Sequence, residues 1–317
     1  MSNTEAAPDQ VSCGPSPFTG VLHPREVPLG GPRAIRVRRT LPQRERSLIG
    51  AWCFVDHYGP HDVRSGTGMD VPPHPHTGLQ TVSWLFSGEI EHRDSAGVRA
   101  LVRPGELNLM TAGAGICHSE VSLPTAPVLH GVQLWVALPD AARHTVRDFA
   151  HFTPTVHVVG AAEVRVFLGD LDGARSPVHT FTPLLGAQVD LAPGGVVELA
   201  VDPAFEHGVL LDEGQVRAGG TSLGVADLWY QSPGHDVVEL TNGGDAPARM
   251  LLLGGTPFTE ELVMWWNFVG RSHDEIVEYR RAWERHDERF GSVEGYPGRR
   301  LAAPPLPTST LIPRPNR

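Results

Sequence analysis

The sequence contains no lysine, and all 26 of its basic residues are arginine. We attribute this bias to genomic codon usage rather than to phosphate recognition. Cysteine is also scarce: Cys13, Cys53 and Cys117 are widely spaced, odd in number and form no Cys-x-x-Cys pair. This usage is typical of a protein from a reducing compartment, so we expect a cytoplasmic location.

Other absences exclude several classes of function. The formal net charge of −10 argues against a general nucleic-acid-binding surface, which is normally basic. No apolar run approaches the roughly 18 residues that a membrane-spanning helix needs, and the start of the chain shows no signal peptide. The Gly-x-Ser-x-Gly, P-loop and dinucleotide-binding motifs are absent as well. We therefore expect no membrane partner and no direct nucleic-acid partner.

The chain does contain many turn residues. Its 35 glycines and 29 prolines are spread among short apolar runs, which favours many short strands in an all-β sandwich or barrel. A length of 317 residues suits two such domains. We predict, in order, a flexible N-terminal arm, a metal-binding β-domain, a second β-domain without metal ligands, a helical segment and a Pro-rich tail. Their bounds are 1–30, 31–150, 151–258, 259–290 and 291–317.

A weak internal repeat supports the division into two β-domains. Residues 206–214 resemble residues 76–88, and residues 224–228 resemble residues 105–109. Tandem copies of this kind indicate duplication. The second copy, however, has no His-x-His and no His-x-Glu pair, so it repeats the scaffold without the candidate ligands described below.

The spacing of apolar residues changes after the second β-rich block. Ser272 followed by Glu275 is a capping box, and apolar residues then recur at helical spacing. We predict a helix over 272–286. The aromatic run over 265–269 before it is interpreted as buried packing or as part of a seam between domains.

Two pairs of polar residues stand out between residues 72 and 120. His74 and His76 lie two positions apart, as do His118 and Glu120. Side chains at i and i+2 of a strand point to the same side, so each pair offers two ligand atoms to one face. If the two strands face each other, three imidazoles and one carboxylate converge on a site for a divalent transition metal. These donors suit Fe(II), Mn, Ni, Cu or Zn and do not choose among them.

The same stretch resembles a known family. The spacing Gly68-(five residues)-His74-x-His76-(three residues)-Gln80-(seven residues)-Gly88 is similar to the first cupin motif, with Gln80 in the place of its glutamate. More specifically, the chain resembles the pirin family of bicupins. The matching stretches span most of residues 45–285 and read FVDHYGP, HPHTGLQTV, EHRDSAG, RPGELNLMTAGAGICHSE, GVQLWVALP and WNFVGRSHDEI.

This resemblance implies two tandem cupin-type antiparallel β-barrels, or jelly rolls, with a short C-terminal helix. It also implies a mononuclear metal, usually iron, whose ligands match His74, His76, His118 and Glu120. Pirins more often have Glu where Gln80 stands and Arg where Ala114 stands. Because the carboxylate ligand lies in the second motif, Gln80 need not abolish metal binding. Both departures bear on pocket polarity and substrate preference.

The resemblance leaves two functional hypotheses from different classes. Some pirin-like proteins are quercetin 2,3-dioxygenases, which implies a small aromatic, flavonol-like substrate and O2 as reactants. In that hypothesis Glu120 is both a metal ligand and the general base for the substrate hydroxyl. Other pirins resemble redox-sensing regulators that contact a protein partner near the metal. A third interpretation is a metal-free bicupin that binds a sugar or another ligand.

The remaining candidate residues carry weaker predictions. Asp56 and His57 are interpreted as a turn or as a pair that supports the metal ligands from outside. His92 and Asp94 are expected to fix a hairpin. Cys117 precedes the candidate ligand His118, so strand alternation should point it away from the metal, as a small buried side chain.

Overall fold

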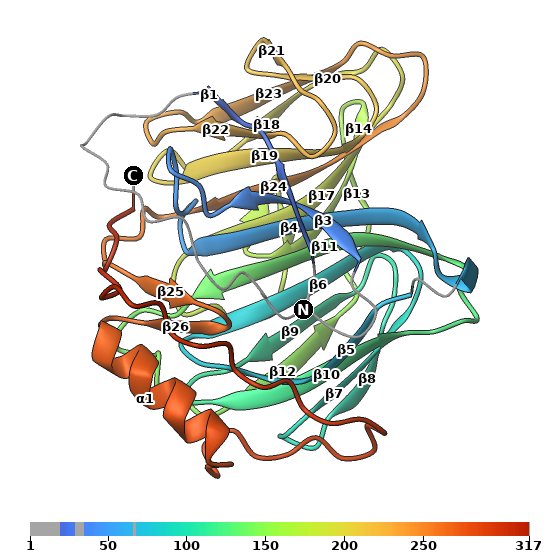
Figure 1. Cartoon of the computed structure of the whole chain (residues 1–317). Helices are drawn as coiled ribbons and strands as arrows, with labels where there is room; N and C mark the ends of the chain where they lie inside the picture. Colours follow the sequence, from blue (N-terminus) through green and yellow to red (C-terminus); the bar gives the residue numbers. More distant parts are fainter. Residues whose placement is uncertain (1–19, 29–34, 66–67, 317) are drawn as a thin grey trace.

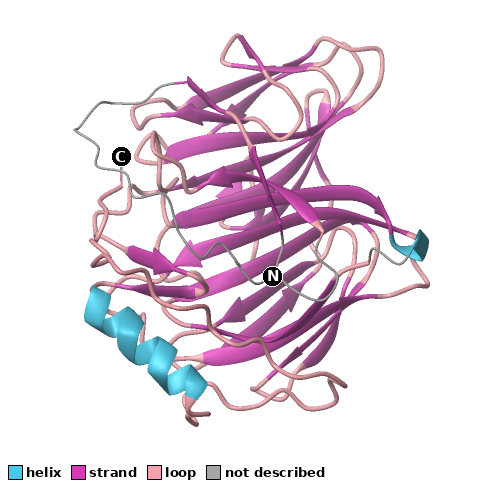
Figure 2. Ribbon diagram, viewed as in Figure 1, coloured by secondary structure: helices cyan, strands magenta, loops and turns pink. Residues whose placement is uncertain are grey.

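The computed structural model describes residues 20–28, 35–65 and 68–316. Within these ranges the protein is built almost entirely from antiparallel strands, with a single α-helix near the C-terminus (Figure 2). Two β-domains are stacked on each other, and the helix lies against the N-terminal domain (Figure 1). The all-β prediction is confirmed. None of the helices in the described ranges is long and apolar enough to cross a membrane.

The N-terminal domain has two sheets among the described residues. The larger sheet has the strand order β12-β9-β6-β11-β4-β3-β2, and the smaller has the order β5-β10-β7-β8. The larger sheet comprises β2 (Arg25–Pro28), β3 (Arg36–Leu41), β4 (Trp52–Asp62), β6 (Leu79–Ser87), β9 (Leu107–Thr111), β11 (Val128–Ala137) and β12 (Asp148–Phe152). The smaller comprises β5 (Asp70–His76), β7 (Ile90–Asp94), β8 (Arg99–Val102) and β10 (Ile116–Ser122).

The C-terminal domain repeats this plan. Its larger sheet has the order β1-β22-β19-β24-β17-β14-β13, and its smaller sheet has the order β18-β23-β20-β21. The larger comprises β1 (Gly20–Leu22), β13 (His157–Val159), β14 (Ala162–Leu168), β17 (Leu184–Leu191), β19 (Glu206–Glu213), β22 (Leu228–Gln231) and β24 (Ala248–Gly255). The smaller comprises β18 (Val196–Ala200), β20 (Val216–Ala218), β21 (Thr221–Ser222) and β23 (Val237–Asn242).

Short elements complete the described chain. They are the 3₁₀ turn Val63–Ser65, the two-stranded pairs β15 (Asp170–Leu171) with β16 (Ala174–Arg175) and β25 (Val263–Trp265) with β26 (Phe268–Gly270), and the helix α1 (His273–Glu284). The capping box is present, since the Ser272 side chain accepts a hydrogen bond from the Glu275 backbone N–H. The helix predicted over 272–286 is thereby confirmed.

The two sheet orders can be aligned strand for strand. In this alignment β6 corresponds to β19 and β9 to β22, which are the strands that carry the internal sequence repeat. β5 then corresponds to β18 and β10 to β23. The inward positions of β18 and β23 are Val197, Leu199, Val238 and Leu240, all of which belong to one apolar core. The second domain therefore packs aliphatic side chains where the first domain places its polar pairs.

The N-terminal strand β1 lies in the sheet of the other domain. Figure 1 shows this blue strand beside the late strands of the C-terminal domain, and Gly20 to Leu22 pair with Tyr230 to Leu228. β1 takes the sheet position that β12 holds in the N-terminal domain. The predicted flexible arm thus includes two strands within 20–28, and its residues 1–19 and 29–30 lie outside the described ranges.

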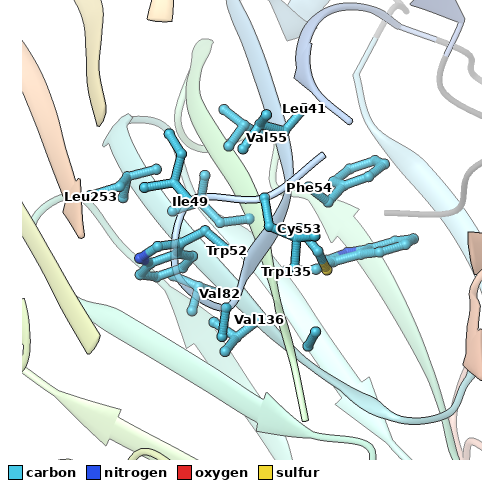
Figure 3. Packing of buried hydrophobic residues seen from close by; sticks show 14 of the residues in the cluster. Leu41, Ile49, Trp52, Cys53, Phe54, Val55, Val82, Trp135, Val136 and Leu253 are labelled. Carbon is cyan, nitrogen blue, oxygen red and sulfur yellow. The ribbon is translucent and has the colours of Figure 1, made fainter. Parts of the chain in front are cut away.

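A large apolar core joins the two domains. It contains Trp52 and Val82 of the first domain and Leu253 of the second, which Figure 3 shows packed together with Ile49. Two indole N–H groups cross the seam: Trp52 Nε1 donates to the Leu185 carbonyl over 3.0 Å, and Trp84 Nε1 donates to Gln188 Oε1 over 2.8 Å. Because this core is continuous, the two domains bury a shared interface.

The C-terminal residues differ from the predicted flexible tail. Residues 291–316 lie in extended form along the N-terminal domain, where Ala303 and Leu311 are buried with Trp283 of α1. The Leu301 backbone N–H donates to the Pro73 carbonyl over 2.9 Å, and the Trp283 indole donates to the Leu301 carbonyl. Proline-rich sequence signals an absence of regular structure, but an extended segment can still be held by packing of its apolar side chains.

Candidate metal centre

The candidate ligands lie on two neighbouring strands of the smaller N-terminal sheet. β5 carries His74 and His76, β10 carries His118 and Glu120, and His118 is directly paired with His74. β5 is an edge strand, so only one of its sides needs hydrogen bonds to a neighbouring strand. It can therefore contain three prolines, which have no backbone N–H to donate. A register irregularity between His118 and Glu120 shifts the two pairs relative to each other. All four side chains are fully buried.

Three imidazole rings converge inside the N-terminal domain. The ring centroids of His74, His76 and His118 lie 4.4 to 5.0 Å apart. His76 Nε2 and His118 Nε2 are separated by 3.0 Å. Two metal–nitrogen bonds of about 2.1 Å at a right angle would place their nitrogen atoms about 3 Å apart. The separation therefore fits two ligands of one ion, and it is also the length of a hydrogen bond between the two rings.

The free nitrogen atoms are those a metal requires. His74 Nδ1 donates to the Pro72 carbonyl over 2.9 Å, which leaves the lone pair on Nε2. That Nε2 atom is buried and has no hydrogen-bond partner among the described residues. Burial lowers the pKa of His74 to about 3 and lowers the pKa of His76 and His118 well below the usual value. The three rings are consequently neutral at physiological pH, which is the form that binds a cation.

Glu120 lies on the other side of His118. Its carboxylate forms one cluster of potential ligand atoms with His118 and His92. His74, His76 and His118 form another. Glu120 Oε1 accepts a hydrogen bond from Ser83 Oγ over 3.3 Å, and the same hydroxyl lies 3.0 Å from Gln133 Oε1. The structure thus brings all four predicted residues into two buried groups that share His118.

Gln80 is directed away from the candidate ligands. It shares a face of β6 with Val82 and Trp84, which pack toward the C-terminal domain, and its amide donates to Thr111 Oγ1. Ser83, on the opposite face of β6, contacts Glu120. The glutamine that departs from the cupin pattern therefore does not belong to the immediate surroundings of the candidate ligands.

We expect the substitution Gln80→Glu to leave metal affinity unchanged within about twofold, because the side chain lies on the far face of its strand. Ser83→Ala is the matched comparison on the near face. Loss of a partner that supports a ligand typically costs about 10-fold or more. Competition of each variant with a chromogenic chelator for Ni²⁺ measures both affinities. A tenfold change in the Ni²⁺ affinity of Gln80→Glu would show that this residue affects metal binding.

Cys117 conforms to its prediction. It lies between the inward residues of β10 and points to the opposite side, where it is buried in the apolar cluster around Trp283 and Phe290. Burial raises the pKa of its thiol to about 11. The thiol is therefore protonated, and Cys117 packs the helix against the sheet.

Two other predictions require correction. Asp56 and His57 do not form a turn, because β4 continues through them to Asp62 and accommodates the Gly59 bend by an irregular register with β11. Asp56 instead receives two hydrogen bonds from buried Arg39, over 2.7 and 2.8 Å. His92 does not merely fix a hairpin: it points inward, and its Nδ1 lies 3.3 Å from His118 Nδ1.

A second polar cluster, at the seam between the domains, was not predicted. His57 Nε2 and His130 Nε2 lie 2.5 and 2.7 Å from Asp212 Oδ1, and Arg249 Nε donates to Asp212 Oδ2 over 2.7 Å. We name these four residues the seam cluster. Its oxygen–nitrogen distances are those of hydrogen bonds, and Arg249 already balances the charge of the carboxylate. Sequence inspection could not find it, since His57 and Asp212 are 155 positions apart.

Buried neutral histidines predict a dependence of stability on pH. Burial lowers the pKa of His57, against an opposing hydrogen bond to Asp212, and lowers the pKa of His207 to about 4. The unfolded chain, with a histidine pKa of about 6.5, then binds more protons than the folded chain below that pH. Stability is therefore complete above about pH 6.5 and falls as the pH decreases.

Each such histidine contributes a slope of about 1.4 kcal/mol per pH unit below its unfolded pKa. Burial opposes the low pKa of Asp212, but hydrogen bonds from His130 and His57 hold it well below its usual value, which adds to the loss below about pH 4. Urea denaturation of metal-free protein between pH 5 and pH 8 measures the effect. Constant stability over this range would contradict it.

The comparisons with known proteins place this geometry in a family. The Pirin family matches residues 34–136, and the Pirin C-terminal cupin domain matches residues 186–291. The chain belongs to the pirin family. Its two β-domains are accordingly cupin domains, and the bicupin prediction is confirmed.

Pirin relatives cover nearly the whole chain. A Pseudomonas aeruginosa protein, named provisionally as a quercetin 2,3-dioxygenase, is 43% identical over 97% of this chain and 98% of its own length. The crystal structure of a quercetin 2,3-dioxygenase from Acinetobacter baumannii has 38% identity and a TM-score of 0.86, covering 91% of this chain and 96% of that one. A bacterial pirin from Escherichia coli in complex with nickel(II) shares the fold, with 16% identity, a TM-score of 0.56 and coverage of 74% and 96%.

Proposed function

We propose that this pirin is a metal-dependent dioxygenase that opens the ring of quercetin or a related enolic aromatic with O2. The observation that carries the proposal is the convergence of three buried neutral imidazoles beside the Glu120 carboxylate. The solved structure of 38% identity that is described as a quercetin 2,3-dioxygenase supports it. Free buried Cys53 and Cys117 suit the cytoplasm as the site of action.

The residues fit one divalent transition metal. His74, His76 and His118 would hold it through Nε2, with Glu120 as the fourth ligand. Imidazole with carboxylate suits Fe(II), Mn, Ni, Cu or Zn, and the family resemblance favours Fe(II) among them. When bound, the metal supplies Lewis acidity that favours the anionic form of an enolic hydroxyl. Nickel(II) in the Escherichia coli relative is compatible with this donor set.

The chain itself supplies a proton acceptor and a way to orient it. Glu120 is the carboxylate among the candidate ligands and takes the proton of the substrate hydroxyl as general base. The Ser83 hydroxyl, 3.3 Å from Glu120 Oε1, holds the carboxylate in place, and Gln133 in turn contacts Ser83. The Trp135 indole packs on His76 in a T-shaped contact, with centroids 5.2 Å apart, and limits the rotation of that ring.

The test combines metal analysis with turnover. Protein purified without a histidine tag should contain about one transition metal per chain. Reloaded with Fe(II) or Mn²⁺, it should consume quercetin only in the presence of O2 and release carbon monoxide. Glu120→Gln should retain part of the metal but lose turnover by about 10²–10⁴-fold, as expected for loss of a general base.

Absence of turnover with Fe, Mn, Co, Ni, Cu and Zn would contradict the enzyme hypothesis. A metal-dependent protein partner recovered in the same preparations would then favour the regulator. Protein that binds no metal at all would exclude both and leave the metal-free ligand-binding interpretation.

A further inference from the structure

His92 and Asp94 form a hydrogen-bonded chain that ends on the candidate ligand His118. Both side chains are inward residues of β7 and are almost fully buried. His92 Nε2 lies 3.2 Å from Asp94 Oδ2, and His92 Nδ1 lies 3.3 Å from His118 Nδ1. β7 pairs with β10 so that His92 stands opposite Glu120 and Asp94 opposite His118. This pairing places the hydrogen-bonded residues of β7 directly beside β10, the strand of His118 and Glu120.

The direction of the proton in each hydrogen bond follows from Asp94. A carboxylate only accepts, so His92 donates through Nε2–H, and its neutral ring then has a lone pair on Nδ1. His118 must therefore donate through Nδ1–H. Its own lone pair is left on Nε2, the atom that lies 3.0 Å from His76 Nε2. The chain thus selects the tautomer of His118 that can bind a metal.

Asp94 is itself fixed by the hairpin between β7 and β8. Its Oδ1 atom accepts hydrogen bonds from the backbone N–H groups of Ala96, over 2.8 Å, and Val98, over 3.1 Å. The Phe149 ring lies against His92, with centroids 4.9 Å apart, and limits its rotation. The carboxylate therefore cannot turn without breaking the hairpin.

We propose that His92 and Asp94 are positioning residues that set the tautomer and ring orientation of His118, so that its Nε2 is available to a divalent transition metal. This inference rests on the proposed metal centre. Partners that hydrogen-bond a metal-ligating histidine typically change metal affinity by about 10–100-fold when they are replaced. Neither residue is required to contact the metal or the substrate.

A nearly isosteric substitution tests the tautomer directly. In Asp94→Asn, the two backbone N–H groups keep the amide oxygen at the Oδ1 position, so the amide NH₂ faces His92 Nε2. His92 must then accept at Nε2 and carry its proton on Nδ1. His118 must accept at Nδ1, and its own proton moves to Nε2, which blocks the metal. We expect the affinity for Ni²⁺ to fall by about 10–100-fold.

The second variant, His92→Phe, removes the chain while it retains a ring to pack on Phe149. It should lower Ni²⁺ affinity by about 10-fold or more. The double variant should bind no more weakly than His92→Phe alone, because Asp94 acts only through His92. A purely structural role of Asp94 in the hairpin would instead cost the same factor in both backgrounds. Arg99→Ala, on the exposed face of the same hairpin, is the control and should bind as the wild type.

Affinities are measured by chelator competition on metal-free protein, with near-UV circular dichroism as the check of folding. Non-additive losses in the double variant support the proposal. It is overturned if Asp94→Asn binds Ni²⁺ within twofold of the wild type, or if the losses are additive. It is also overturned if His92→Phe binds no Ni²⁺ at concentrations that saturate the wild type, since His92 would then be a ligand. A wild type that binds no metal would remove the proposed function as well, so the two failures are distinguishable.

Discussion

Replacement of His76 by alanine should abolish metal binding under conditions in which the wild type is saturated, and oxygen-dependent turnover of quercetin with it. The ring provides one of two nitrogen atoms that face each other over 3.0 Å, and the described residues close to it contain no substitute donor in that position. Loss of an outer partner costs about 10–100-fold, and loss of a ligand should exceed this. We expect a decrease of at least about 10³-fold in turnover.

The measurement requires a control for the other histidines. His235→Ala removes an exposed histidine of the C-terminal domain and should change neither metal content nor turnover. Metal content is determined by elemental analysis and turnover by the loss of quercetin absorbance. Normal metal content in His76→Ala would show that the metal is held elsewhere. Normal turnover without metal would contradict the proposed chemistry altogether.

Substitution of Asp212 by alanine should destabilise the protein by about 3–5 kcal/mol, the usual cost when one member of a buried ionic group is removed. Asp212 is fully buried and accepts from His57 in one domain and from Arg249 in its own. Without the carboxylate, Arg249 retains a charge near the seam, although Phe86 still stacks on its guanidinium. The interactions lost with the carboxylate are those that join the two cupin domains, so the substitution weakens the contact between them.

Denaturant unfolding of metal-free protein checks this prediction. The matched control is Asp190→Ala, since Asp190 pairs with Arg165 in a site that is about a quarter exposed on both sides. That pair should contribute about 1 kcal/mol or less. An Asp212→Ala variant that loses no more than the control would show that the seam cluster does not couple the domains.

Sequence periodicity sufficed to place each of the two candidate pairs on one face of its strand, because that information is local. His74 with His76 and His118 with Glu120 each occupy one face of a strand, and alternation alone aligns them. His92 and Asp94 have the same spacing, but the Asp-Ser-Ala-Gly turn beside them favoured a hairpin role. Both functions are present, because the two oxygens of Asp94 bond different partners.

Contacts between segments that are far apart in the chain could not be predicted from the sequence. Nothing near Gly20 indicates that it pairs with Tyr230, and nothing near His57 indicates Asp212. These contacts arise from the stacking of two duplicated domains. Local signals were also misleading at the Tyr58-Gly59-Pro60 stretch, where turn residues occur inside a continuous strand with a bulge.

The first and last segments that the structure describes are bound to opposite halves of the molecule. β1 pairs with β22 of the second domain, and the Leu301 backbone N–H is bonded to the Pro73 carbonyl, next to His74. During synthesis, domains generally fold from the N-terminus onward. Here the first cupin domain would leave the ribosome before the segment around Leu301 is available. Strand β5 would lack its contact with that segment until residue 301 emerged. Metal capture is therefore expected as a late event, after residue 301 has emerged.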